Sequence, residues 1–242
     1  MRTIFLADAH LSMPTDRNYR VLLQFLRELE GNTAALFVMG DLFDFWLGFS
    51  SRPFRQYDVV LAALHTLVRS GCRLIYFEGN HDFHLGTVFR DELGAEIHTG
   101  PAIQTVQGRR LFLCHGDEIN SADRGYRFLR RLLHNRLAAT AVRYVPPLLA
   151  LRLKDILQQR SRSGYRAKVA RWNYRDIIRG FAGSLREQGC DGLVCGHFHL
   201  GFSEELEGTR FTILSLGDWM ERFTYGEVVA GELLLKSYTP EE

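Results

Sequence analysis

Five short apolar runs in this 242-residue chain each end in a side chain that can bind a metal ion. Each run has the length and composition of a buried β-strand, and a turn follows it. The carboxyl ends of neighbouring strands in an open α/β sheet converge on one crevice, so we expect these polar side chains to meet there. The runs are residues 2–7, 34–39, 73–77, 110–114 and 192–195.

Helices are expected between the first three strands, because residues 17–29 and 57–70 carry apolar side chains at helical spacing. Gly71 suits the C-cap of the second helix. After residue 199 the chain becomes β-rich, and a second, partly antiparallel sheet is expected to close an α/β fold. The expected later strands are 202–206, 211–216, 225–230 and 233–238.

Charge is distributed unevenly, although the formal net charge is only +2. Residues 121–180 hold 15 Lys and Arg against three acidic residues, a net +12, while the rest holds 15 against 25, a net −10. Within a helical pattern at 121–185, residues 137–153 are strongly apolar. We expect an anionic partner for this basic segment, and a helical cap whose apolar run is either a lipophilic surface or packing against the main domain.

Cysteine usage and the absence of long apolar runs indicate the compartment. The four cysteines lie in or beside apolar runs without CxxC spacing, which favours reduced, buried thiols. The N-terminus does not have the pattern of a signal peptide, and no apolar run reaches the roughly 20 residues of a membrane span. A cytoplasmic location is therefore expected.

The strand ends supply seven nitrogen and oxygen donors. Imidazole, carboxylate and amide ligands suit Mn²⁺, Fe²⁺ or Zn²⁺, and the lack of thiolates argues against a structural zinc site. On an extended backbone His197 and His199 point the same way, toward one metal. Seven ligands overfill a single ion, so two ions are expected. The predicted ligands are Asp8, His10, Asp41, Asn80, His115, His197 and His199.

Five motifs occur in order between Asp8 and His199: Asp-x-His, Gly-Asp-x-x-Asp, Gly-Asn-His-Asp, His-Gly-Asp and Gly-His-x-His. In this order and spacing the sequence resembles the calcineurin-like metallophosphoesterases. The resemblance implies a two-sheet β-sandwich flanked by helices, with a helical cap inserted at 121–185 of a single domain, 1–242. It also implies that Asp41 bridges two ions. One ion would be held by Asp8, His10, Asp41 and His199, and the other by Asp41, Asn80, His115 and His197.

Two residues outside the ligand set, His81 and Asp44, are the predicted catalytic residues. His81 is placed beside Asn80 to stabilise the developing phosphorane charge or to protonate the leaving oxygen, with Asp44 as its partner. The alternative for both residues is a structural role around the ligands. Because two metal ions lower the pKa of a shared water, no Ser or Cys nucleophile is required.

Further stretches resemble the UDP-2,3-diacylglucosamine diphosphatase family: the residues after Gly40, the dipeptide Asp82-Phe83, and residues 122–126. This resemblance implies hydrolysis of a nucleotide-linked lipid to UMP and 2,3-diacylglucosamine 1-phosphate in lipid A biosynthesis, with two divalent ions, most simply Mn²⁺. The cap would also meet an anionic membrane surface, which makes the protein peripheral on the inner membrane. The predicted substrate contacts are Asn80, His81, Asp123, Arg160 and Arg166.

Two departures leave other activities open. Proteobacterial members of that family carry Arg where this chain has His81, and residues 158–166 replace a Ser/Asn/Lys-rich stretch. A sibling enzyme with another substrate is one alternative, and a nuclease that clamps nucleic acid with its basic cap is another. A non-catalytic interaction module would predict eroded ligands, whereas all seven are present. No obligate protein partner is expected.

Overall fold

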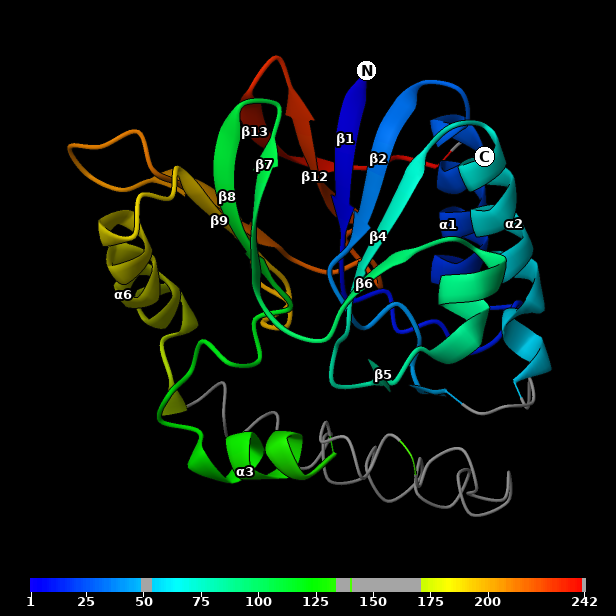
Figure 1. The fold of residues 1–242 in the computed structure, drawn as a ribbon, viewed down its shortest axis with the longest axis horizontal. Coiled ribbons are helices and arrows are strands. Elements are labelled where there is room, and N and C mark those ends of the chain that lie inside the picture. Colours follow the sequence, from blue (N-terminus) through cyan, green and yellow to red (C-terminus); the bar gives the residue numbers. More distant parts are fainter. Residues whose placement is uncertain (49–53, 134–139, 141–170, 241–242) are drawn as a thin grey trace.

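A computed structural model describes residues 1–48, 54–133, 140 and 171–240 of the chain (Figure 1). Two β-sheets pack face to face, with helices α1 (Arg17–Leu29) and α2 (Asp58–Arg69) on one outer side. Helix α6 (Tyr174–Glu187) lies on the other side. The expected two-sheet sandwich flanked by helices is therefore confirmed.

The first sheet has six strands in the order β13-β12-β1-β2-β4-β6. Its central strands are parallel, as crossovers through α1 and α2 require, and β12 and β13 add antiparallel strands at one edge. The bounds are β1 (Arg2–Leu6), β2 (Thr33–Val38), β4 (Arg73–Phe77), β6 (Glu96–His98), β12 (Thr224–Val229) and β13 (Glu232–Ser237).

The second sheet has five strands in the order β10-β11-β9-β8-β7. Strands β8, β9 and β11 are parallel to one another, and the outer two are antiparallel to their neighbours. The bounds are β7 (Ala102–Val106), β8 (Arg109–Cys114), β9 (Gly192–Cys195), β10 (Gly201–Glu205) and β11 (Thr212–Leu216). Shorter elements are β3 (Trp46–Leu47), β5 (Asp82–Phe83), η1 (Arg55–Tyr57), η2 (Val88–Glu92) and α3 (Arg124–Leu133).

Alternation along β1 explains why its sequence is apolar throughout. Ile4 and Leu6 face the helices α1 and α2, whereas Phe5 and Ala7 face the second sheet. A third apolar cluster, which includes Leu193 and Cys195, lies between the second sheet and α6. The strands that carry the polar turns are thus buried on both faces, which makes them a rigid base for a site.

The strand ends meet for a different reason from the one expected. The expectation was argued from the edge of an open sheet, whereas β1, β2 and β4 belong to the first sheet and β8 and β9 to the second. The polar residues still meet, because these strands end at the same edge of the sandwich (Figure 1). The C-terminal strands likewise divide between the sheets, since β12 and β13 pair beside β1 while β10 and β11 pair beside β9.

The predicted cap lies largely outside the described residues, as does its apolar run at 137–153. Of the 121–185 segment, the structure describes α3 and the greater part of α6, at either end. Within the described part of the chain, no helix is both long enough and apolar enough to cross a membrane. All four cysteines are free and buried, as predicted.

Candidate metal centre

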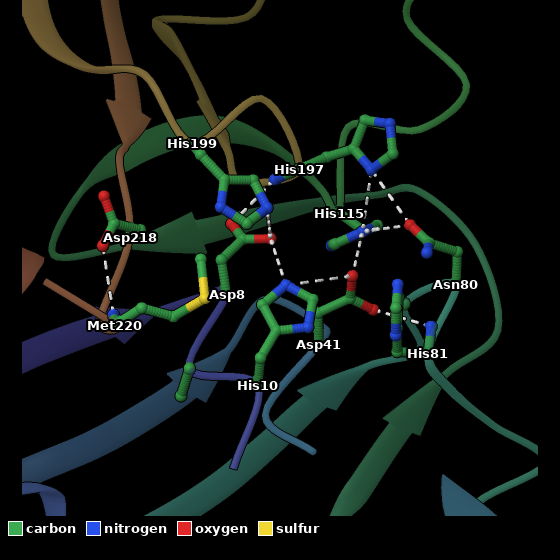
Figure 2. Close-up of polar contacts among 12 residues, drawn as sticks. Asp8, His10, Asp41, Asn80, His81, His115, His197, His199, Asp218 and Met220 are labelled. Atoms are coloured by element: carbon green, nitrogen blue, oxygen red, sulfur yellow. Dashed lines mark hydrogen bonds and ion pairs between the residues drawn. The ribbon is translucent and has the colours of Figure 1, made fainter. Parts of the chain in front are cut away.

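The seven predicted ligands lie together at the edge where the two sheets end (Figure 2). They fall into two groups, and the carboxylate of Asp41 stands between them. One group follows β1 and β9, and the other follows β2, β4, β8 and β9. Both sheets therefore contribute to the site.

The first group contains Asp8, His10 and His199, whose donor atoms all lie within 4.8 Å of one another. Asp8 Oδ1 is 3.6 Å from His199 Nε2 and 3.9 Å from His10 Nε2. Asp8 Oδ1 and His10 Nε2 are buried and have no hydrogen-bond partner. Buried polar atoms are rarely left in this state, and a cation between them would satisfy both. These residues therefore fit a divalent metal ion.

The second group contains Asp41, Asn80, His115 and His197. Asn80 Oδ1 is 3.2 Å from His115 Nε2 and 3.0 Å from His197 Nδ1, and the two ring nitrogens are 3.3 Å apart. His115 Nδ1 contacts the Met39 carbonyl oxygen at 2.8 Å. If that nitrogen donates, Nε2 is left as the ligand atom, which is the usual arrangement of a metal-binding imidazole.

Asp41 connects the groups. Its Oδ2 lies 3.5 Å from His115 Nε2 in the second group and 3.8 Å from His10 Nε2 in the first. A carboxylate in this position can contact two ions at once. This position is compatible with the predicted bridge, which stays a prediction.

Five of the seven residues adopt the left-handed backbone conformation, with φ between 43° and 69°. Asp and His tolerate this region better than most residues, but it remains costly and persists only where the surroundings enforce it. Backbone hydrogen bonds enforce it here, from Asp8 N to Gly40 O at 3.1 Å and from His10 N to Asp41 O at 3.0 Å. The five residues are Asp8, His10, Asp41, His197 and His199.

Glycines in the motifs make room for the carboxylates. A Cβ on Gly79 would lie 2.1 Å from Asp41 Oδ1, and one on Gly196 would lie 2.6 Å from Asp8 Oδ2. The oxygen beside Gly196 accepts a hydrogen bond from His197 N at 2.8 Å. Any larger residue at these positions would displace a predicted ligand.

Burial lowers the pKa of three of the four ligand imidazoles and so favours their neutral form, which is the form that binds metals. Burial lowers the pKa of His197 to about 3 and also lowers the pKa of His10 and His199. Burial would lower the pKa of His115 as well, but the Asp41 carboxylate outweighs it and raises that pKa well above 6.5. Burial raises the pKa of Asp41, yet His115 and His81 outweigh it and hold that pKa well below its usual range.

His81 and Asp44 lie beside the first group. Their donor atoms and those of His10 are within 4.8 Å of one another, and the rings of His81 and His10 meet edge to face at 4.7 Å. His81 Nδ1 is 2.9 Å from the main-chain oxygen of Asp44. The backbone N–H of His81 donates to Asp41 Oδ1 at 2.8 Å. The structure thus brings both predicted catalytic residues to the site, while their roles stay predictions.

Asp82 was given no role of its own in the sequence analysis, where it appears only within motifs. In the structure its side chain holds the turn that carries Asp41. Its buried carboxylate accepts hydrogen bonds from the backbone N–H of Asp41 at 2.9 Å, Leu42 at 2.7 Å and Gly79 at 3.1 Å. The Tyr76 hydroxyl also donates to it at 2.5 Å. Asp82 therefore fixes the loop after β2 onto the loop after β4.

Asp218 is a residue that the sequence reasoning missed. Its Oδ1 accepts from the backbone N–H of Met220 at 3.1 Å (Figure 2) and from that of Glu221 at 2.8 Å. In the same turn, Trp219 N donates to the carbonyl oxygen of Asp8 at 3.2 Å. The sequence does contain a signal for Asp218, because the apolar run at 211–216 is also followed by a glycine and an aspartate.

The remaining predicted substrate residues are not brought to the site by described contacts. Asp123 precedes α3, and its backbone oxygen accepts from Arg127 N at 3.0 Å. Arg160 and Arg166 lie outside the described residues.

Residues 1–201 match the model of the calcineurin-like phosphoesterase family. The chain is therefore a member of the calcineurin-like phosphoesterases, a family of metal-dependent phosphohydrolases, which implies divalent metal ions at the donor groups described above.

Individual relatives extend over nearly the whole chain. The UDP-2,3-diacylglucosamine hydrolase of Stutzerimonas stutzeri is 31% identical over 223 residues, covering 89% of this chain and 90% of the relative. The protein of the same name from Pseudomonas paraeruginosa is 31% identical over 225 residues, covering 90% and 91%. A solved archaeal phosphodiesterase is 14% identical with a TM-score of 0.49, covering 98% of this chain and 100% of that one.

Proposed function

We propose that the protein hydrolyses UDP-2,3-diacylglucosamine to UMP and 2,3-diacylglucosamine 1-phosphate in lipid A biosynthesis. The observation that carries the proposal is the pair of donor groups joined by Asp41, at the edge shared by both sheets. The choice of substrate is supported by relatives that bear that name and match about nine-tenths of the chain.

Two Mn²⁺ ions are the proposed cofactors, since nitrogen and oxygen donors without thiolate suit this metal. One ion would be held by Asp8, His10, Asp41 and His199, and the other by Asp41, Asn80, His115 and His197. When bound, such a pair supplies a water of lowered pKa and neutralises charge on the phosphoryl oxygens.

His81 is the proposed proton donor to the leaving oxygen, or the stabiliser of charge on the phosphoryl group. The contact between its Nδ1 and the Asp44 carbonyl oxygen fixes the ring at 4.7 Å from His10. The proposed substrate contacts are Asn80, His81, Asp123, Arg160 and Arg166.

Residues 121–185 are proposed to form a cap on the single domain, 1–242, that binds the lipid and an anionic membrane surface. Two features of α3 support this proposal: Phe128 and Leu132, one turn apart, are 70% and 55% exposed, and Arg127 and Arg131 beside them are also exposed. Apolar and basic side chains in this arrangement favour an interface with anionic lipid. The protein would then be cytoplasmic and peripheral on the inner membrane.

The test of substrate offers UDP-2,3-diacylglucosamine, bis-p-nitrophenyl phosphate and single-stranded DNA side by side, with Mn²⁺ and with EDTA. We expect the nucleotide lipid to have the largest kcat/KM and EDTA to abolish turnover. Preference for DNA would replace the proposal with a nuclease, and turnover that survives EDTA would contradict the metal centre.

The membrane proposal is tested by cosedimentation with vesicles of phosphatidylglycerol and of phosphatidylcholine. We expect binding to the anionic vesicles only, and weaker binding when Phe128 and Leu132 are both replaced by Ser. Equal binding of the double variant would show that α3 is not the contact.

A further inference from the structure

Helix α3 is joined to the metal centre by a short folded connection. The chain leaves β8 at His115 and turns through buried Ile119 and Asn120. Ile119 N donates to Gly116 O at 3.1 Å, and the Asn120 side chain accepts from Ala122 N at 3.1 Å. The stretch between His115 and the start of α3 is therefore folded by its own hydrogen bonds.

One ion pair holds the helix farther along its length. Arg130 Nε donates to Asp117 Oδ2 at 2.5 Å, and the Asp117 side chain is fully buried. Asp117 stands two residues after His115, whereas Arg130 lies in the second half of α3. The pair thus links the helix directly to the loop that carries a metal ligand.

Burial singles out Arg130 within the helix. Among the α3 side chains that the structure describes, Arg130 alone is not exposed. The others are Arg124, Arg127, Phe128, Arg131 and Leu132, and all of them face solvent. Arg130 is therefore the least exposed of the described α3 side chains, and its guanidinium pairs with the buried carboxylate of Asp117.

We propose that Arg130 is a positioning residue that, through Asp117, holds the first helix of the cap at the rim of the metal centre and so selects for large substrates. Figure 1 shows α3 beyond the edge of the sandwich at which the strands end, and the predicted ligands directly follow those strands in the sequence. A substrate that binds both the cap and the metal ions requires a fixed distance between them, and a small misplacement there is costly. The inference rests on the proposed function.

The metal ligands have their own supports, so loss of the anchor leaves them in place. Strand β8 pairs with β9 up to Cys114 and Cys195, and His115 Nδ1 contacts the Met39 carbonyl oxygen. A small diester that needs only the metal ions is therefore hydrolysed whether or not α3 is anchored. Only a substrate that spans the cap and the ions depends on Arg130.

The test compares Arg130→Met with Arg131→Met, which removes the same charge from an exposed neighbour on the same helix. For Arg130→Met, kcat/KM on UDP-2,3-diacylglucosamine should fall about 10- to 100-fold. Turnover of bis-p-nitrophenyl phosphate should stay within about threefold, and the metal content should not change. Arg131→Met should stay within about threefold on both substrates. Arg130→Lys, which keeps the charge, should recover part of the loss.

Hydrogen exchange supplies a readout that does not depend on the substrate. The backbone amides of α3 should exchange faster in Arg130→Met than in the wild type or in Arg131→Met. A parallel fall on both substrates, an equal effect of Arg131→Met, or unchanged exchange would each overturn the proposal.

Arg130→Met alone leaves the buried Asp117 carboxylate unpaired, so a folding defect must be distinguished from loss of the anchor. The double variant that combines Arg130→Met with Asp117→Asn has no unpaired buried charge, and it should show the same split between substrates. Equal kinetics of this double variant and the wild type would count against the anchor. If the wild type hydrolyses bis-p-nitrophenyl phosphate but not the nucleotide lipid, the proposed function fails, while hydrogen exchange still decides whether Arg130 anchors α3.

Discussion

The two donor groups of the metal centre are built differently. In the second group, Asn80 Oδ1 and two ring nitrogens lie within 3.3 Å of one another, and His115 is almost completely buried. In the first group, Asp8 Oδ1 lies 3.6 Å from His199 Nε2 and 3.9 Å from His10 Nε2. The second group is thus the more compact of the two; it is called the inner site below, and the first group is called the outer site.

The difference follows from what supports each group. The inner group lies on turns fixed to one another by Asp82 and by the contact of His115 with Met39 O. The outer group holds two buried atoms with no hydrogen-bond partner, Asp8 Oδ1 and His10 Nε2. We infer that the inner site is the more completely assembled without metal, whereas the outer site gains more from its ion.

The largest effect is expected where the groups share a residue. Asp41→Ala removes the carboxylate between them, so both ions should be lost and kcat should fall about 10³-fold or more, corresponding to about 4 kcal/mol of transition-state stabilisation. His115→Ala should have a comparable effect on activity. Elemental analysis together with kinetics checks both variants. Full activity of Asp41→Ala with one bound ion would remove the bridge from the scheme.

The next experiment separates the groups. His199→Ala should lose the outer ion and keep about one ion per chain, because the inner donors remain intact. His197→Ala should weaken the inner ion instead. Metal content after dialysis against a weak chelator distinguishes the two variants. If the wild type gives up both ions together at the same chelator concentration, the inner and outer sites are not distinct.

A smaller effect is expected from Asp82, which touches only the inner turns. Asp82→Asn presents an N–H group to backbone donors, so it should lower metal affinity by about 10- to 100-fold. Tyr76→Phe is the matched control, because it removes one hydrogen bond to the same carboxylate and should cost about 1 kcal/mol of stability. Isothermal titration with Mn²⁺ and thermal unfolding measure the two effects. Wild-type affinity in Asp82→Asn would contradict the positioning role.

The last predictions concern the pH dependence of stability in the metal-free protein. Burial lowers the pKa of His197 from 6.5 to about 3, so between pH 6.5 and about pH 3 the unfolded chain binds this proton while the folded chain does not. Stability should therefore fall as pH drops below 6.5, by about 2 kcal/mol from this residue at pH 5. His197→Gln should remove that part of the loss in urea unfolding with EDTA.

His115, in the same group, has the opposite effect on the pH dependence of stability. Burial lowers its pKa, but Asp41 outweighs burial and raises the pKa well above 6.5. Its contribution is present below pH 6.5 and lost as pH rises through the raised pKa. His115→Gln should therefore flatten the alkaline side of the stability profile of the metal-free protein, and an unchanged alkaline side would contradict the coupling to Asp41.

Much of the fold, and the meeting of the predicted ligands at one place, could be predicted from the sequence for a physical reason. Strands buried on both faces, such as β2 and β9, are apolar throughout and end abruptly at polar turns, so their ends are conspicuous. The residues of each strand did not predict to which of the two sheets that strand belongs, because pairing partners depend on long-range packing. Asp218 was missed because its role is to accept backbone hydrogen bonds, which leaves no mark beyond a Gly-Asp turn.

The left-handed backbone at five ligand positions restricts how this site can change over evolution. At Asp8, His10, Asp41, His197 and His199, a β-branched replacement would clash with its own backbone, while Asn or Gly fits the same turn. A descendant that loses a metal ion is therefore expected to pass through Asn or Gly at these positions. The sandwich and its turns would survive such a change, so the architecture can outlast the chemistry it supports.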